Sequence, residues 1–255
     1  NKFANWDYPY QKSNQICLYL GLRGQNYLRT FPFGQGWGFG TVNPKIWEDW
    51  FDDDIRKTGS IFNVTNRNEV VLYTFGADSH VDETSYVQKK YIPINVYADG
   101  THTVVHNYSM ELYGNTVDNY MLNNTQDLVL IRFADVLLMA AELNLGTAKA
   151  QSFLDRVRAR VNLPSVPATL DNIKAERRFE LAFEGVRFYD LLRWHDADRV
   201  LNENQKDIVI YRSRTETVTK TITYRPETNG FLQIPLSEIE LSKGVLTANP
   251  GWGSE

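Results

Sequence analysis

The stretch from residue 128 to 194 constrains the fold more than any other, because it carries a series of helix patterns. Residues 128–145 are apolar apart from one narrow charged face, which predicts a central helix. Residues 148–161 repeat apolar side chains at helical spacing. A third helix is predicted from residue 170 through 184, and its pattern can continue past Gly185. Short connections between these helices predict helical-hairpin packing.

Carboxylates follow one face of the third predicted helix. Glu176, Glu180 and Glu184 recur at every fourth residue, and Arg187 continues the same face. Side chains at this spacing are neighbours on a helix, and four arginines lie close by in the sequence. Guanidinium groups keep nearby carboxylates ionised and paired, so we predict a charge-paired seam and not a catalytic set. The apolar stripe predicted beside this seam comprises Phe179, Ala182, Phe183, Val186 and Tyr189.

Charge and cysteine content exclude several classes of function. The net charge is −4, from 27 Lys+Arg against 31 Asp+Glu, so no basic field favours nucleic acid. The single cysteine, Cys17, excludes an intramolecular disulfide. Its apolar neighbours predict an inert thiol in a buried strand at residues 16–22. Charged residues interrupt residues 128–145, which therefore predict a buried helix and no membrane span.

Changes of pattern divide the chain into three parts. Residues 1–127 have the pattern of short strands and long loops, and residues 128–203 have the pattern of a helical scaffold. Residues 204–255 are expected to be a strand and loop segment that packs back on the scaffold. The length of 255 residues allows one large domain or two small ones. Further strands are predicted at residues 69–75, 86–92, 215–224 and 231–234, and a further helix with Asn43 as its cap and Pro44 at its first position.

Aromatic residues are abundant, and many lie in Gly- and Asn-rich segments. The chain has 6 Trp, 14 Tyr and 13 Phe. Flat rings in such segments are typical of exposed platforms, on which the C–H faces of sugars stack while amide and guanidinium groups bond the hydroxyls. The predicted ligand-binding residues are Trp37, then Tyr27 and Trp6, with Arg29 and Asn26 as polar partners.

Patterns for other chemistries are weaker. The glycine-rich loop at residues 31–41 lacks the preceding strand and the lysine of a nucleotide-binding loop. His102 and His106 lie in a β-branched run without the glutamate of a metalloprotease helix. The densest acidic run, residues 52–54, is expected to be a helix C-terminal turn or a solvated loop. We therefore predict no metal, no cofactor and no catalytic residue, although the paired carboxylates of a glycosidase stay open.

Three segments resemble the SusD/RagB family of outer-membrane glycan-binding lipoproteins. Residues 130–142, LIRFADVLLMAAE, are similar to the family's LIRYADVLLMYAEA helix. Residues 157–194 contain ERRFELAFEGVRFYDLLRW, which is similar to ERRxELAFEGxRxxDLxRW. Residues 233–239 and 249–252, QIPLSEI and NPGW, resemble the family's closing motif. The first half of the chain matches more loosely, at the DDDIR of residues 52–56 and in its Gly/Trp loop.

The resemblance implies one mostly α domain with irregular and short β structure, the SusD-like fold. In it tetratricopeptide-like helix pairs support a loop-rich ligand-binding face, here residues 1–127. It also implies a glycan ligand and a SusC-like TonB-dependent outer-membrane transporter as partner, with helices contacting the transporter and loops contacting the ligand. Members are non-catalytic and lie on the extracellular face of the cell outer membrane. They are held there by lipid on an N-terminal cysteine that is not in this sequence. Members are commonly much longer, so we expect further chain before residue 1.

The sequence therefore predicts a surface glycan-binding subunit of a polysaccharide or oligosaccharide uptake system. Three alternatives stay open. They are a helical protein-interaction scaffold, a peptide-binding nutrient-capture protein of the RagB kind, and a glycosidase.

Overall fold

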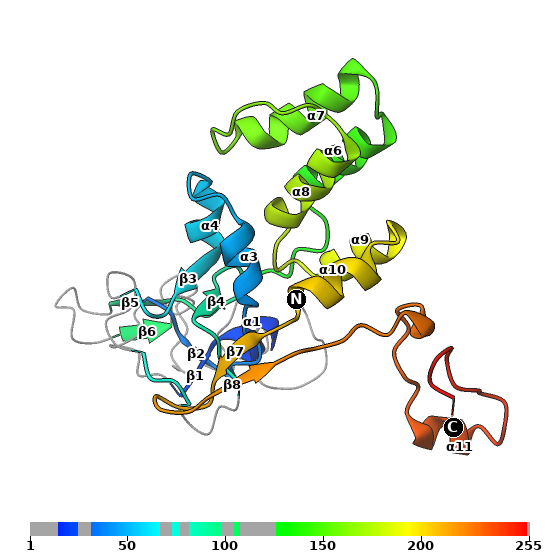
Figure 1. The fold of residues 1–255 in the computed structure, drawn as a ribbon. Coiled ribbons are helices and arrows are strands. Elements are labelled where there is room, and N and C mark those ends of the chain that lie inside the picture. The colour runs from blue at the N-terminus through cyan, green and yellow to red at the C-terminus, as the bar shows by residue number, and fades with distance from the viewer. Residues whose placement is uncertain are drawn as a thin grey trace, which may run out of the picture. The chain divides into compact units, whose positions relative to one another are not determined.

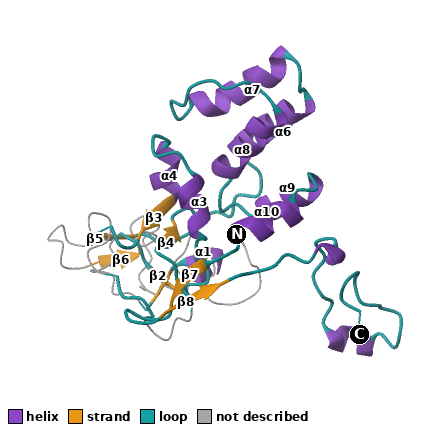
Figure 2. Cartoon of the chain, in the orientation of Figure 1, coloured by secondary structure: helices purple, strands orange, loops and turns teal. Residues whose placement is uncertain are grey.

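The computed structural model describes residues 15–24, 32–66, 73–76, 82–97, 105–107 and 126–253 (Figure 1). The chain forms two compact units. The first comprises Asn1–Glu184 with Val209–Val218, and the second comprises Gly185–Ile208 with Thr219–Glu255. The described residues are mostly helical with a few short strands, as Figure 2 shows, and the predicted fold class is confirmed.

Short helices with good caps organise the loop-rich part of the first unit. α3 (Pro44–Asp49) begins where predicted. The Asn43 side chain accepts a hydrogen bond from the N–H of Lys45 at 3.0 Å. Pro44 has no N–H, but the first residue of a helix has no acceptor for one within the helix, so nothing is lost. α4 (Ile55–Ser60) begins after Asp54, whose side chain accepts the N–H of Arg56. The other helix of this part is α1 (Gln15–Leu20).

The strands of the described residues form two-stranded sheets. β3 (Ile61–Asn63) pairs antiparallel with β4 (Tyr86–Gln88), which lies inside the strand predicted at residues 86–92. β7 (Ile208–Tyr211) pairs with β8 (Thr217–Lys220), which lies inside the strand predicted at residues 215–224. The other pairs are β1 (Leu22–Arg23) with β2 (Gln35–Gly36), in parallel, and β5 (Asn95–Tyr97) with β6 (Val105–Asn107), antiparallel.

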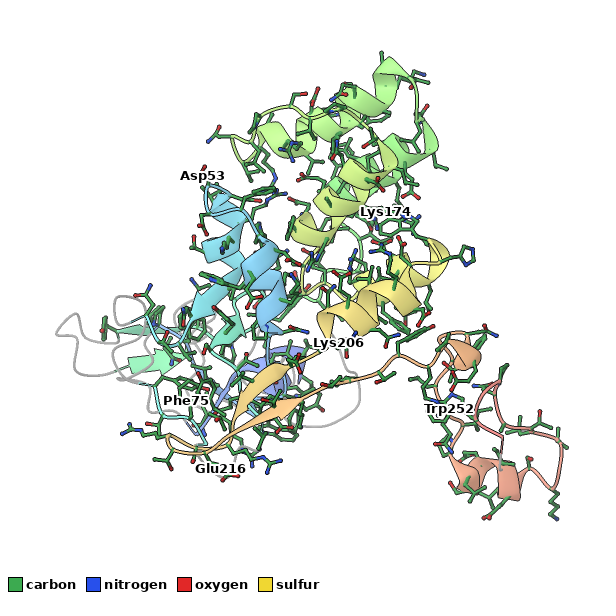
Figure 3. All side chains as sticks on the ribbon, viewed as in Figure 1. Asp53, Phe75, Lys174, Lys206, Glu216 and Trp252 are labelled. Atoms are coloured by element: carbon green, nitrogen blue, oxygen red, sulfur yellow. The ribbon has the colours of Figure 1, made fainter. Side chains whose placement is uncertain are left out.

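Residues 209–218, which form most of the β7–β8 hairpin, pack on the loop-rich part of the first unit. Figure 3 shows Phe75 beside this hairpin, whose turn carries Glu216. The Phe75 ring stacks on Tyr211 with centroids 4.2 Å apart, and Tyr211 exchanges backbone hydrogen bonds with Glu83. These contacts place a late segment of the chain against an early one.

Three helices form the helical part of the first unit: α6 (Phe133–Leu143), α7 (Ala148–Ala159) and α8 (Leu170–Glu180). Their shared core includes Leu138, Leu154 and Ile173, each fully buried. Within the described residues, every helix is too short or too polar to cross a bilayer.

The prediction that α6 is central is wrong for one of its faces. Phe133 and Leu143 are 62% and 86% exposed, and Val136 and Met139 between them are also exposed. α7 and α8 cover the opposite face, which carries Leu138. An apolar run predicts a helix, but it does not show which faces find a neighbour within the described residues.

The third predicted helix is two helices. α8 ends at Glu180, and α9 (Arg187–Arg193) follows a break in which Phe183 and Gly185 have φ of 66° and 81°. Such left-handed conformations end a helix. The predicted apolar stripe therefore breaks too: Phe179 and Ala182 are buried, whereas Tyr189 is 70% exposed.

The second unit contains α9, α10 (Ala197–Asn204), a 3₁₀ turn (Pro226–Thr228) and α11 (Leu236–Leu241). The strand predicted before α11 is absent from residues 231–234. Side chains from the end of the chain take the backbone acceptors there, since Trp252 Nε1 donates to Phe231 O at 2.8 Å and Asn249 Nδ2 donates to Leu232 O at 2.7 Å. The prediction of a strand was wrong because these acceptors are bonded to side chains.

Cys17 lies in helix α1 and not in the predicted strand. A short apolar run cannot distinguish a buried strand from a buried helix, and this one is a helix. The thiol is buried as predicted, and its burial raises the pKa of Cys17 to about 12. A thiol with this pKa is protonated at neutral pH and therefore a poor nucleophile.

Candidate functional site

The glycine-rich loop around Trp37 is held against the end of α1. The Trp37 N–H donates to the carbonyl oxygen of Leu18, and the Phe39 N–H donates to that of Tyr19, both at 2.8 Å. Glycine is required at position 36, because a Cβ on Gly36 would lie 2.4 Å from the Leu18 oxygen. The loop backbone therefore fits closely on the helix, and this fixes where its side chains point.

The hydrogen bonds between this loop and α1 bring three rings together. We call them the aromatic cluster: Tyr19, Trp37 and Phe39. The centroid of Trp37 lies 5.2 Å from that of Tyr19 and 6.0 Å from that of Phe39. Phe39 is 64% exposed, Tyr19 is 39% exposed, and Trp37 is half-buried. The cluster is a supported aromatic surface that is open to a ligand, and flat rings of this kind stack on the C–H faces of sugars.

Only one of the predicted ligand-binding residues, Trp37, lies in the described part of the chain. Tyr27, Trp6, Arg29 and Asn26 lie outside the described residues. The ligand-binding role of all five stays a prediction.

Sequence reasoning left Tyr19 out of the site. It assigned residues 16–22 to a buried strand, whereas Cys17 and Leu18 are buried in a helix and Tyr19 faces outward. If the same residues are taken as a helix, Tyr19 points to a different side of that helix from Cys17 and Leu18. Phe39 had a visible signal, because it lies two residues after Trp37 in the same glycine-rich loop.

The carboxylates Glu176, Glu180 and Glu184 lie in a charge network, as predicted for the seam. The prediction that Arg187 continues the same helix face is wrong, because α8 ends at Glu180 and Arg187 begins α9 after the break. Glu180 accepts hydrogen bonds from Arg56 at 2.8 Å, from Arg132 at 2.8 Å and from Arg160 at 2.7 Å. Glu176 accepts from Arg56 and from Arg158. The network comprises Asp54, Arg56, Lys90, Arg132, Arg158, Arg160, Glu176, Glu180 and Glu184.

The acidic run before α4 has two environments. Asp52 and Asp53 are exposed, and Asp53 lies at the turn between α3 and α4 (Figure 3). Asp54 is 2% exposed and bonds the Arg56 guanidinium through both carboxylate oxygens. The prediction of a helix C-terminal turn or solvated loop is therefore wrong for Asp54, because this residue is buried at the N-terminal cap of α4 and Arg56 bonds its carboxylate.

The network keeps two of its carboxylates, Glu180 and Asp54, ionised. Burial alone would raise the pKa of Glu180, but hydrogen bonds from Arg132 and Arg56 outweigh it and hold that pKa below its usual 4.5. Burial would likewise raise the pKa of Asp54, and the bonds from Arg56 and Trp50 hold it below its usual 3.8. Glu180 and Asp54 are therefore paired ions at neutral pH.

The free energy of unfolding is expected to fall in acid. Both carboxylates have folded-state pKa values below their unfolded ones, so their contribution is present above about pH 4.5 and is lost as the pH falls through the folded values. Thermal unfolding followed by circular dichroism from about pH 7 to about pH 3 measures this loss. A midpoint that stays constant over that range would contradict it.

The described residues contain no group of three His, Cys, Asp or Glu side chains that could hold a metal ion. His102 lies outside them, and so does the side chain of His106.

The chain belongs to the SusD family. The family model matches residues 23–252, which include the loop of the aromatic cluster, the charge network and the helices α6 to α11. The resemblance of the helical motifs to this family is thereby confirmed.

Solved structures share the fold. A laminarin binding SusD-like protein is 32% identical with a TM-score of 0.69, and the match covers 94% of this chain and 44% of that one. Surface glycan-binding protein A from Bacteroides fluxus is 26% identical with a TM-score of 0.69, covering 94% and 46% of the two chains. The predicted SusD-like fold is confirmed.

A curated relative is the SusD-like protein P2 of Formosa agariphila, which is 25% identical over 206 residues. This match covers 74% of the present chain and 37% of the relative. The chain thus spans less than half the length of these relatives.

Proposed function

We propose that this chain is the part of a surface glycan-binding protein that presents an aromatic platform to carbohydrate. The exposed aromatic cluster is the observation that carries the proposal. Tyr19 and Phe39 offer ring surface to solvent, and Trp37 supports both from a loop whose backbone is bonded to α1. A rigid ring surface binds with little loss of side-chain entropy, which favours capture of a weakly held polymer.

A laminarin-type glucan is the first ligand to test. The 32% identical structure is named as a laminarin binding protein, and this suggests a related glucan for the present chain. Laminarin is neutral, so its sugar faces suit a platform of rings better than a charged site does.

A non-catalytic role agrees with the state of the buried carboxylates. A glycosidase needs one carboxylic acid with a raised pKa to protonate the leaving group. Glu176 and Glu180 are each bonded to arginine, and the pKa of Glu180 is lowered. These two carboxylates are therefore poor candidates for the acid.

The partner and location are proposed from the family. A SusC-like TonB-dependent transporter would receive the glycan, and a lipid anchor on the full-length protein would hold it at the extracellular face of the cell outer membrane. Release toward a transporter requires contacts that are individually weak, as expected for stacking on open rings.

Affinity electrophoresis in native gels containing laminarin tests the proposal. The chain should be retarded as the laminarin concentration rises, and bovine serum albumin in the same gel should not be. A reducing-end assay on the same mixture should detect no release of sugar.

Two outcomes would oppose this function. An unretarded band at the highest laminarin concentration, together with binding of a peptide library, would favour peptide capture. Released reducing ends would show a glycosidase.

A further inference from the structure

A cavity lies in the first unit beside the charge network, away from the aromatic cluster. Its volume is about 460 Å³, within the range of roughly 300–1,000 Å³ found for small-molecule pockets. α4, α8 and the segments around Lys90 and Arg132 contribute to its wall. None of the residues of the aromatic cluster lines it.

The acceptors on the cavity wall are already occupied. Glu180 accepts hydrogen bonds from three arginines, and Glu184 accepts from Lys90 and Arg132. A ligand that donates hydrogen bonds to these carboxylates would compete with buried ion pairs. The wall therefore disfavours a cationic ligand.

Donors on the same wall remain available. Arg160 donates through Nη2 to both oxygens of Glu180, while its Nε and Nη1 donate to no described residue, and its side chain is 56% exposed. Ser60 is 4% exposed and lines the cavity. Its hydroxyl has no hydrogen-bond partner among the described residues. Tyr91 is also 4% exposed, and its hydroxyl accepts from Val129 N–H but donates to nothing described.

The charge of the wall favours an anion. Asp54 and Glu176 behind the wall bond Arg56, and Arg158 bonds Glu176, so the charge network as a whole has five cations, four carboxylates and an excess of one positive charge. The lining itself carries four cations and two carboxylates. The cations are Arg56, Lys90, Arg132 and Arg160, and the carboxylates are Glu180 and Glu184. Guanidinium groups with free N–H donors bind carboxylates through charge-assisted hydrogen bonds.

Apolar side chains complete the wall and distinguish a sugar acid from a bare anion. Ile55, Val129 and Val161 line the same cavity. They can pack on the C–H face of a sugar ring while the hydroxyls of Ser60 and Tyr91 meet its oxygens. A small inorganic anion would leave these apolar contacts unused.

We propose that this cavity is a binding site for an acidic sugar, with Arg160 holding the carboxylate of a hexuronate. The ring lies against the apolar wall, and Ser60 and Tyr91 donate to its oxygens. The site goes beyond the laminarin platform, because a neutral glucan offers no carboxylate to Arg160.

Isothermal titration with sodium glucuronate, with glucose as the neutral probe, tests the site. Glucuronate should bind and glucose should not, and added sodium chloride should weaken binding by screening the exposed Arg160. Arg160→Gln should weaken glucuronate binding at least about tenfold, because it removes the cation that the carboxylate meets. Ser60→Ala should weaken it by a smaller factor.

Matched controls separate this site from folding and from the laminarin platform. Arg156→Gln changes an exposed arginine one turn earlier on α7, outside the cavity wall, and should leave glucuronate binding unchanged. Trp37→Ala should also leave it unchanged. Arg160→Gln should keep the circular dichroism spectrum and the retardation by laminarin of the original chain.

Three results would overturn the proposal. The first is equal binding of glucose and glucuronate, or binding of neither. The second is glucuronate binding that survives Arg160→Gln. The third is sodium sulfate binding as tightly as glucuronate and being lost in Arg160→Gln, which would show a general anion site in place of a sugar-acid site.

Discussion

Glu180→Gln is expected to lower the free energy of unfolding by about 3–5 kcal/mol, which is the usual cost of removing one partner of a buried ion pair. Glu180 is 2% exposed and accepts hydrogen bonds from Arg56, Arg132 and Arg160. Glutamine keeps the shape of the side chain but removes the negative charge. Arg56, whose side chain is 9% exposed, would then be buried with less compensating charge. Urea denaturation followed by tryptophan fluorescence measures the loss.

The matched control is a glutamate with an exposed partner in the same unit. Glu216 is 59% exposed at its side chain and lies 3.6 Å from Arg212. Glu216→Gln should change the free energy of unfolding by no more than about 0.5 kcal/mol, because exposed pairs contribute little. Equal losses for Glu180→Gln and Glu216→Gln would show that the network does not stabilise the fold. The Glu180 variant should also lose part of the acid dependence of stability.

Trp37→Ala is expected to weaken laminarin binding at least about tenfold, which corresponds to about 1.4 kcal/mol. The substitution removes one ring and also the support of the other two, since Trp37 lies against both Tyr19 and Phe39. Trp37→Phe keeps a ring in place and should retain more of the affinity. Isothermal titration with laminarin measures all three proteins.

An exposed ring outside the cluster is the control for this effect. Phe51 is 71% exposed and makes no ring contact with a described residue. Phe51→Ala should leave laminarin affinity unchanged. If Phe51→Ala and Trp37→Ala weaken binding equally, exposed aromatic area in general binds the glycan and the aromatic cluster is not its site.

The candidate site could be predicted only in part. Features that depend on neighbouring residues show in the sequence, whereas contacts between segments far apart in the chain do not. Trp37 could be chosen because a tryptophan in a glycine-rich loop is a local pattern. Its neighbour Tyr19 could not, since the two meet only when the loop bonds to α1. The charge network follows the same rule. The spacing of Glu176 and Glu180 shows in the sequence, whereas Arg56 reaches Glu180 from 124 residues away.

The sequence by itself determined the family, the positions of the main helices and the row of carboxylates on α8. Each of these depends on residue types at short spacing, which helix periodicity and capping translate directly into local structure. The tertiary structure decided which rings form a platform, which cations pair with α8, and which donors face the cavity beside the charge network. Those outcomes depend on backbone bonds and ion pairs between segments far apart in the chain, and no local pattern encodes them.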